Sequence, residues 1–148
     1  MPEVLGCVDF SDASDAVVAE AVRIARESGN RLHLLHVAAG ESALAGYDEG
    51  PVAVHTRDER AHELTDEHHR LRELAAENAT DGLEIVPLLI MGATVETIVA
   101  EADRIDAATI VVGSHGHSKL RKLLLGSVSE GVVRHASRPV VIVPVGER

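Results

Sequence analysis

A segment near the C-terminus contains the residue types with which proteins bind phosphate. Residues 108–112 form a short apolar run typical of a buried strand, and the apolar spacing that follows residues 126–129 is typical of a helix. Gly113 and Gly116 lie in the loop between them, where glycine lets the backbone approach a ligand closely. A helix N-terminus offers unpaired N–H groups and a positive dipole end. The segment therefore predicts an anion site at a strand–loop–helix junction.

The charges and hydroxyls of this segment favour a polyphosphate. The chain has a formal net charge of −10, yet both of its lysines, Lys119 and Lys122, lie in this loop with Arg121 between them. A positive cluster beside a helix N-terminus attracts phosphate groups, and Ser127 and Ser129 would add hydroxyl donors in the first helical turn. Ordinary turn and cap glycines with a solvated cationic surface are the alternative, but the agreement of glycines, serines, cations and the strand–loop–helix context favours a phosphate site.

The glycine spacing resembles a family signature. Gly113-x-x-Gly116, nine residues and then Gly126-Ser127 is similar to the G-2x-G-9x-G-(S/T) motif of the nucleotide-binding branch of the universal stress protein family. The resemblance extends over nearly the whole chain and is weakest over 38–80. Three further segments are similar to recurring segments of that family: 8–11, 34–37 and 138–144.

The resemblance implies a ligand and the residues that contact it. The ligand would be ATP with Mg²⁺. Phosphate oxygens and water supply most ligands of such an ion, and the protein supplies few. No residue is therefore assigned as a metal ligand. Asp9 would contact the adenosine end, although a role in capping the first helix or its turn is an equal alternative. Backbone groups of Val8 and Val37 would face adenine. The full set of implied contacts is Val8, Asp9, Val37, Gly113, His115, Gly116, Gly126, Ser127, Val128 and Ser129.

The elements that must position these residues follow from periodicity. Aromatic residues make up 1% of the 148-residue chain, so the core must consist of Val, Ile, Leu and Ala, which favours buried parallel strands covered by helices. Strands are expected at 3–9, 31–37, 84–90, 108–112 and 140–143. Helices are expected at about 13–28, where Ser11 or Asp12 is the N-cap and Gly29 the end, and at 56–78, 94–102 and 126–136.

The expected fold is α/β, with a five-stranded, mostly parallel sheet and helices on both faces, in a single domain over 1–148. Strand order does not follow from periodicity. The family resemblance implies the order 3-2-1-4-5, a flavodoxin-like three-layer sandwich, in which the first and fourth strands are neighbours at the topological switch point. Asp9 would end the first strand there, and Gly113 would end the fourth.

Composition excludes several classes of function. The acidic balance argues against a general nucleic-acid binder, and no apolar run approaches the length of a membrane span. The start of the chain lacks the features of a secretion signal, so a cytoplasmic location is expected. Cys7 is expected to be a small core residue. The excess of acidic residues raises the hypothesis of a cytoplasm of high salt, to be tested by melting temperature against KCl concentration.

Other residues leave alternatives open. His115 or His117 could act as a general acid or base near the γ-phosphate, but contact with phosphate or solvent is the favoured role. Residues 62, 66 and 69 (His, Asp and His) could bind Zn²⁺ from one helix face, although a solvated face is favoured. His68 is expected to be half-buried. The stretch 38–55 could be a lid or an ordinary surface loop.

The expected function is that of an ATP-binding, cytoplasmic stress-response regulator with little or slow hydrolysis, acting on an unidentified protein partner. Within the family the closing strand, here 138–144, pairs with its symmetry mate, which implies a C₂ homodimer. The alternatives are a nucleotide-free dimeric scaffold and a weak ATPase or phosphotransferase that uses His115 or His117.

Overall fold

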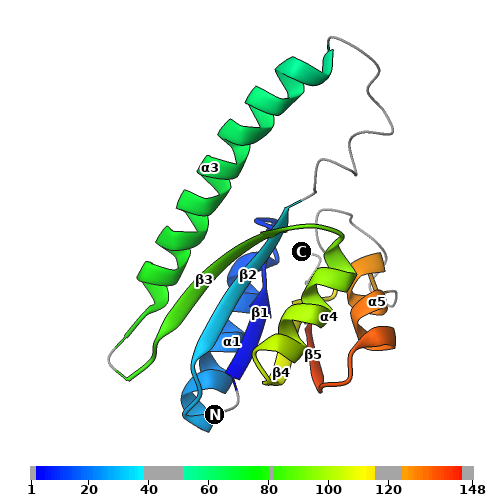
Figure 1. Ribbon diagram of the computed structural model, residues 1–148. Helices are drawn as coiled ribbons and strands as arrows, with labels where there is room; N and C mark the ends of the chain where they lie inside the picture. The colour runs from blue at the N-terminus through cyan, green and yellow to red at the C-terminus, as the bar shows by residue number, and fades with distance from the viewer. Residues whose placement is uncertain (1–2, 39–51, 81, 116–124, 145–148) are drawn as a thin grey trace.

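The fold is a five-stranded parallel sheet between two layers of helices. The structure, a computed structural model, describes residues 3–38, 52–80, 82–115 and 125–144, and gives the backbone alone for 52–60. The sheet order is β3-β2-β1-β4-β5, and all four neighbouring pairs are parallel (Figure 1). This confirms the expected order 3-2-1-4-5. The strands are β1 (Glu3–Cys7), β2 (Leu32–Ala38), β3 (Ile85–Met91), β4 (Ala107–Gly113) and β5 (Val140–Val143).

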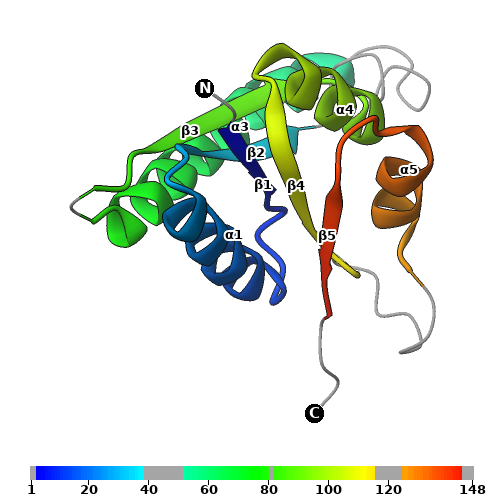
Figure 2. The same ribbon diagram turned by 90° about the horizontal axis from the view of Figure 1, so that it is seen from below.

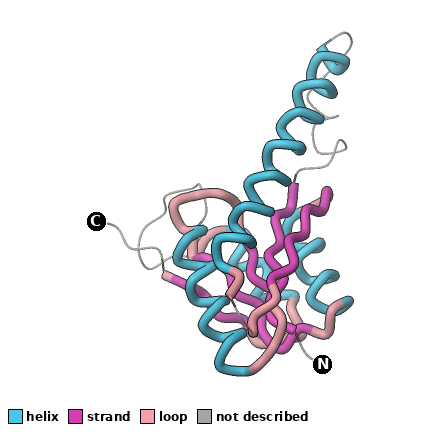
Figure 3. The backbone as a smooth tube through the Cα atoms, turned by 90° about the vertical axis from the view of Figure 1, so that its left-hand side faces the viewer, coloured by secondary structure: helices cyan, strands magenta, loops and turns pink. Residues whose placement is uncertain are grey.

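Four described helices cover the two faces of the sheet. They are α1 (Ser14–Ser28), α3 (Val52–Asn78), α4 (Thr94–Arg104) and α5 (Ser127–His135). The helices α1 and α3 lie on one face, and α4 and α5 lie on the other (Figures 1 and 2). The helix α3 runs alongside β3, and its first turns extend beyond the ends of the strands (Figure 3).

The core divides into two apolar layers because successive strand residues point to opposite faces. Val4 and Leu34 pack with α1 and α3, whereas Leu5 and Leu35 pack with α4. All four side chains are fully buried. Both layers consist of aliphatic residues, as the near absence of aromatic residues requires.

The two ends of α1 show where local sequence signals succeed and fail. Gly29 ends the helix in a left-handed conformation with φ 70°, as expected for a glycine C-cap. The expectation that Ser11 or Asp12 is the N-cap was wrong, because Ala13 occupies that position and has no side-chain cap. Ser11 instead accepts a hydrogen bond from the Ala13 N–H at its Oγ (3.3 Å), so its hydroxyl stabilises the turn that precedes the helix.

Three further expectations need correction. The strand β1 ends at Cys7, so Asp9 lies two residues beyond the strand. The long helix α3 begins at Val52 instead of residue 56, so the end of the expected 38–55 loop is helical, and 39–51 lie outside the described residues. His68 is exposed and not half-buried, because only the later turns of α3, with Leu71 and Ala75, are buried against the core.

Candidate functional site

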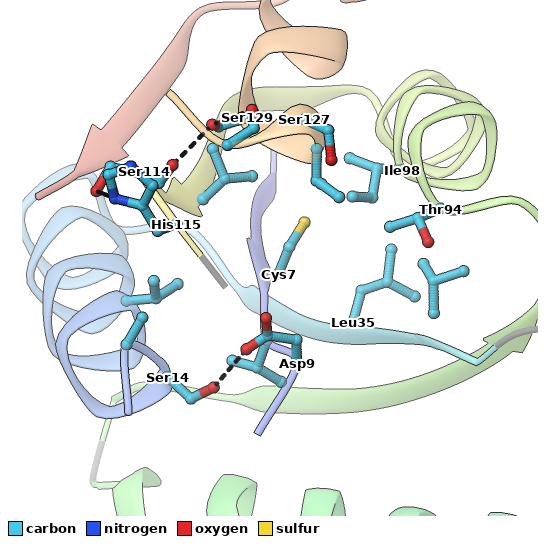
Figure 4. A pocket seen from close by; sticks show the side chains of 18 residues that line it. Cys7, Asp9, Ser14, Leu35, Thr94, Ile98, Ser114, His115, Ser127 and Ser129 are labelled. Carbon is cyan, nitrogen blue, oxygen red and sulfur yellow. Dashed lines mark hydrogen bonds between the residues drawn. The ribbon is translucent and has the colours of Figure 1, made fainter. Parts of the chain in front are cut away.

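A cavity of about 230 Å³ opens at the carboxyl ends of β1 and β4 (Figure 4). In the order β3-β2-β1-β4-β5, the connections of these two neighbours leave toward opposite faces of the sheet. Such a switch point leaves a crevice in which α/β proteins bind ligands. The cavity floor is mainly apolar, and polar groups lie at its two sides (Figure 4). The sequence therefore folds so that Gly113, Gly126 and the end of β1 border the same space.

Helix N-termini line this cavity from both faces of the sheet. Ser14 belongs to the first turn of α1, Thr94 to that of α4 and Ser127 to that of α5. The N-cap residues of all three helices, Ala13, Ala93 and Gly126, lack a side-chain hydrogen bond to the helix. Because a helix N-terminus has N–H donors without an intrahelical partner, uncapped ends beside a cavity favour an anionic ligand.

The start of α5 is held in place by bonds within the protein. The Gly126 N–H donates to the Ser114 carbonyl oxygen (2.7 Å), and the Ser114 N–H donates to the Val143 carbonyl oxygen (2.9 Å). A Cβ at position 126 would lie 3.2 Å from the Ser114 oxygen, so glycine permits this close approach. These contacts fix the end of β4 and the first turn of α5 relative to β5.

The two serines in the first turn of α5 have different surroundings. Ser129 is 2% exposed, and its Oγ lies 3.0 Å from both the Ser114 and Gly126 carbonyl oxygens. A hydroxyl has a single hydrogen, so Ser129 donates it within the protein and stabilises the junction. Ser127 is exposed and lines the cavity. The hydroxyl that faces the cavity opening is therefore that of Ser127.

The spacing of α4 and α5 depends on Gly131. A Cβ at this position would lie 2.7 Å from Cγ2 of Val95, a distance that real Cβ atoms essentially never show. Glycine thus lets α5 pack closely against α4, and this packing brings both helix N-termini to one cavity. The spacing of the glycine motif gives no indication of this contact.

Asp9 lies on the side of the cavity opposite Ser127 (Figure 4). Its Oδ1 accepts a hydrogen bond from the Ser11 N–H (2.9 Å) and one from Ser14 Oγ (3.4 Å). These bonds fix the carboxylate at the edge of the cavity. The two alternative roles of Asp9 are compatible. The residue stabilises the turn before α1 through its hydrogen bonds, and it also borders the cavity where a ligand would bind.

Cys7 and His115 also line the cavity, and their side chains differ in character. Burial raises the pKa of the Cys7 thiol to about 12, so the thiol is neutral at physiological pH and behaves as part of the apolar floor. His115 is 8% exposed, and its Nδ1 lies 3.3 Å from Ser114 Oγ. Its Nε2 has no hydrogen-bond partner within the described part of the chain. A buried polar atom without a partner is uncommon and is often satisfied by a ligand or water.

The structure brings nine of the ten predicted contact residues to one cavity, and the tenth, Gly116, lies outside the described residues with His117 and the loop cations. Contact of these residues with a nucleotide stays a prediction. Sequence reasoning missed the other nine residues that line the cavity. The carboxyl-end rule could have found Cys7, Val112 and Ser114 as well as Thr94, because these residues lie at or just beyond the ends of strands. No pattern marked the lining residues from the start of α1 and the interior of α4. The missed lining residues are Cys7, Ala13, Ser14, Val17, Leu35, Thr94, Ile98, Val112 and Ser114.

The alternative zinc face on α3 is a solvated surface. His62, Asp66 and His69 are all exposed, and His69 Nε2 pairs with Glu73 Oε1 at 2.9 Å. Over the described ranges, no group of three or more His, Cys, Asp or Glu residues is arranged to hold a metal ion. Among the described helices, none has the length and apolar character needed to cross a membrane.

Comparison with known proteins identifies relatives along the full chain. The model of the universal stress protein family matches residues 1–144. Universal stress protein YxiE of Bacillus subtilis is 33% identical over 144 residues, which cover 95% of this chain and 97% of that protein. The solved structure of protein MJ0577 of Methanocaldococcus jannaschii has a TM-score of 0.81 at 24% identity and covers 99% and 98% of the two chains. A universal stress protein solved in complex with cAMP has a TM-score of 0.64 at 26% identity and covers 97% and 96%.

Proposed function

The chain belongs to the universal stress protein family, and we propose that it binds ATP with Mg²⁺ in the cavity between β1 and β4. The phosphates would lie over the first turn of α5, and the adenosine would lie toward Asp9, Val8 and Val37. The observation that carries the proposal is the uncapped α5 N-terminus, which borders the cavity together with the exposed Ser127 hydroxyl. The related universal stress protein bound to cAMP supports an adenine nucleotide as the ligand class.

The cavity chemistry suits binding better than fast turnover. Asp9 is the one carboxylate among the described residues that line the cavity, and it lies on the side away from α5. Its Oδ1 already accepts two hydrogen bonds. A group that orients an attacking water near the phosphates would need to be within hydrogen-bond reach of it. We therefore propose a nucleotide-responsive regulator with slow hydrolysis, acting in the cytoplasm on a protein partner.

The proposed regulator is a homodimer through β5. This strand lies at one edge of the sheet, and its four apolar residues are only half-buried. An apolar edge strand with unpaired backbone groups favours pairing with a second strand. Light scattering at micromolar concentration should give the mass of a dimer, and a monomeric mass would contradict this part of the proposal.

Two measurements test nucleotide binding. Mass spectrometry of the ligand released from the purified protein should identify an adenine nucleotide. Calorimetric titration of the ligand-free protein should give a saturable ATP isotherm. If no nucleotide co-purifies and the titration is flat, the proposal is wrong, and a nucleotide-free dimeric scaffold becomes the better account.

One observation supports a second function, weak phosphotransfer or hydrolysis. His115 lines the cavity, and its buried Nε2 has no hydrogen-bond partner among the described residues. If this nitrogen becomes accessible to bound nucleotide, it could exchange a proton with a phosphate oxygen or a water. His115→Ala should abolish phosphate release while ATP still binds if this imidazole is catalytic. Equal phosphate release by the variant and the parent protein would exclude the catalytic role.

A further inference from the structure

Four side chains join the end of β1 to the helix α3, immediately beside the cavity. We call them the Phe10 cluster: Phe10, His36, Glu67 and Arg70. The Phe10 ring lies between two partners, because its centroid is 4.6 Å from that of the His36 ring and 4.4 Å from Cζ of Arg70. Such contacts, a tilted ring pair and a cation over a ring face, are both attractive. The cluster thus ties two strand ends to one helix.

His36 connects the same elements by polar contacts. It is 8% exposed, and its Nδ1 lies 2.9 Å from the Val8 carbonyl oxygen. Its Nε2 lies 3.4 Å from Oε2 of Glu67 on α3. Both ring nitrogens therefore face acceptor oxygens, one at the end of β1 and one on α3. The His36 ring therefore lies between the Val8 carbonyl and α3.

The backbone at Phe10 is strained. Its φ is 62°, in the left-handed region that a bulky aromatic residue rarely adopts. Strain of this kind persists where surrounding contacts hold the residue, and it gathers at functional sites. Here the contacts that hold Phe10 are those of His36 and Arg70. One contact to this strained residue thus comes from β2, through His36, and one from α3, through Arg70.

Neighbours along the chain face either the cavity or the cluster. Asp9 lines the cavity and Phe10 lies in the cluster, while on β2 Val37 lines the cavity and His36 lies in the cluster. Residues that contact α3 and residues that border the nucleoside side of the cavity are thus consecutive. The cavity and the cluster are therefore joined directly through the backbone at two places, between Asp9 and Phe10 and between His36 and Val37.

We propose that the Phe10 cluster couples the nucleoside side of the cavity to the docking of α3, so that nucleotide binding and α3 docking stabilise each other. The inference rests on the proposed function, because it assumes that an adenosine group occupies that side. Coupling of this kind is reciprocal. Phe10, His36, Glu67 and Arg70 are positioning residues in this account, and α3 is the element that changes when nucleotide binds.

The test uses two arginine substitutions on the same helix. Arg70→Met removes the cation over the Phe10 ring, and Arg72→Met makes the same change at an exposed position that has no contact with Phe10 among the described interactions. ATP and inorganic tripolyphosphate are each titrated into both variants and the parent protein. We expect Arg70→Met to weaken ATP binding by about threefold, the size of one cation–ring contact, and to leave tripolyphosphate affinity unchanged. Arg72→Met should change neither affinity.

Hydrogen exchange gives a readout that loss of packing alone would not produce. ATP should slow amide exchange over 61–78 of α3 in the parent protein and in Arg72→Met, and this slowing should be smaller in Arg70→Met. The inference is overturned if ATP leaves α3 exchange unchanged in the parent protein, or if Arg70→Met weakens ATP and tripolyphosphate equally. Failure of the parent protein to bind ATP at all would overturn the proposed function, and this inference with it.

Discussion

The two ends of the sheet differ in how their polar groups are satisfied. Charged residues directly before the strands are paired: Arg31 bonds Glu3 (2.7 Å) before β2, and Arg138 bonds Asp106 before β5. His33 Nε2 adds a contact to Glu3 at 3.0 Å. The carboxyl ends of the strands differ in capping, since three helix N-termini there lack side-chain caps among the described residues. Each end has one described residue other than glycine with positive φ, Phe10 (62°) beyond β1 and Asp106 (53°) before β4, and this conformation is more strained for the aromatic residue.

This difference separates stability from function. Paired charges at the amino ends of the strands satisfy one another between neighbouring elements, and because these pairs are partly exposed each adds only modestly to stability. Uncapped N–H groups at the carboxyl ends weaken the empty protein slightly and gain partners when an anion binds. Local rules of helix capping are therefore broken at the end of the sheet where we propose the site, and the bulky residue with a positive φ, Phe10, lies there too, as is typical of functional regions.

The largest expected effect is that of a negative charge at the α5 N-terminus. Ser127→Glu should weaken ATP binding by about 100-fold, because two like charges a few ångströms apart repel by several kcal/mol in a partly buried site. Stability should hold or rise slightly, since an anion at this end complements the helix dipole. Calorimetry and urea unfolding measure the two quantities, with Ser127→Ala as the matched control. Parallel loss of binding and stability would remove the contrast between the two ends.

The next effect concerns the packing that brings α5 beside α4. Gly131→Ala places a Cβ 2.7 Å from Val95, so the helices must separate. Overpacking of this kind costs about 2 kcal/mol of unfolding free energy, and ATP affinity should fall as well because the α5 N-terminus moves. Urea unfolding and ATP titration check both results. Unchanged stability would show that the contact between α4 and α5 adapts easily.

A glycine before β2 should affect stability alone. In Gly29→Ala the new Cβ meets no atom within 4 Å, but alanine must adopt φ 70°, in the left-handed region. We expect a loss of about 1 kcal/mol in unfolding free energy and an unchanged ATP affinity. Thermal unfolding with and without ATP tests this. A weaker ATP affinity would mean that the amino ends of the strands also influence the site.

The smallest effect is expected for the ion pair at the start of β1, and it should depend on pH. The hydrogen bond from Arg31 holds the pKa of the Glu3 carboxyl below its usual value of 4.5. Because the folded pKa is depressed, this stabilisation is full above the unfolded pKa and is lost as pH falls through the folded pKa. Because the Arg31 side chain is 45% exposed, solvent screens the pair, and Glu3→Gln should reduce stability at pH 7 by less than Gly29→Ala does. The difference from the parent protein should shrink in acid, and a difference that stays constant down to pH 3 would contradict the ion-pair account.

Much of the fold could be predicted because its signals are local. Apolar runs marked all five strands, and Gly29 and Gly126 marked helix ends that the structure confirms. Strand order came from the family resemblance and not from periodicity, since periodicity carries no information on which strands are neighbours. The predicted N-cap of α1 was wrong because the Ser11 hydroxyl stabilises the turn before the helix instead of the helix itself.

The site was harder to predict because it depends on contacts between distant segments. The glycine motif indicated the start of α5, but Ser129 donates its hydrogen within the protein, and this role depends on Ser114, which lies 15 residues earlier. The closeness of Gly131 to Val95 and the cluster around Phe10 are also tertiary contacts. Residue types and spacing along the chain do not encode such pairings directly.

The central claim is that backbone amides at the start of α5 bind the phosphates of a nucleotide. Its most direct test is an amide NMR titration of the ligand-free protein with ATP and Mg²⁺. The account predicts saturable shifts at Ser127, Val128 and Ser129, with little change at Arg31, Glu84 and Asp106 before the strands. Shifts confined to the amino ends of the strands, or none at the α5 start at saturating ATP, would contradict it.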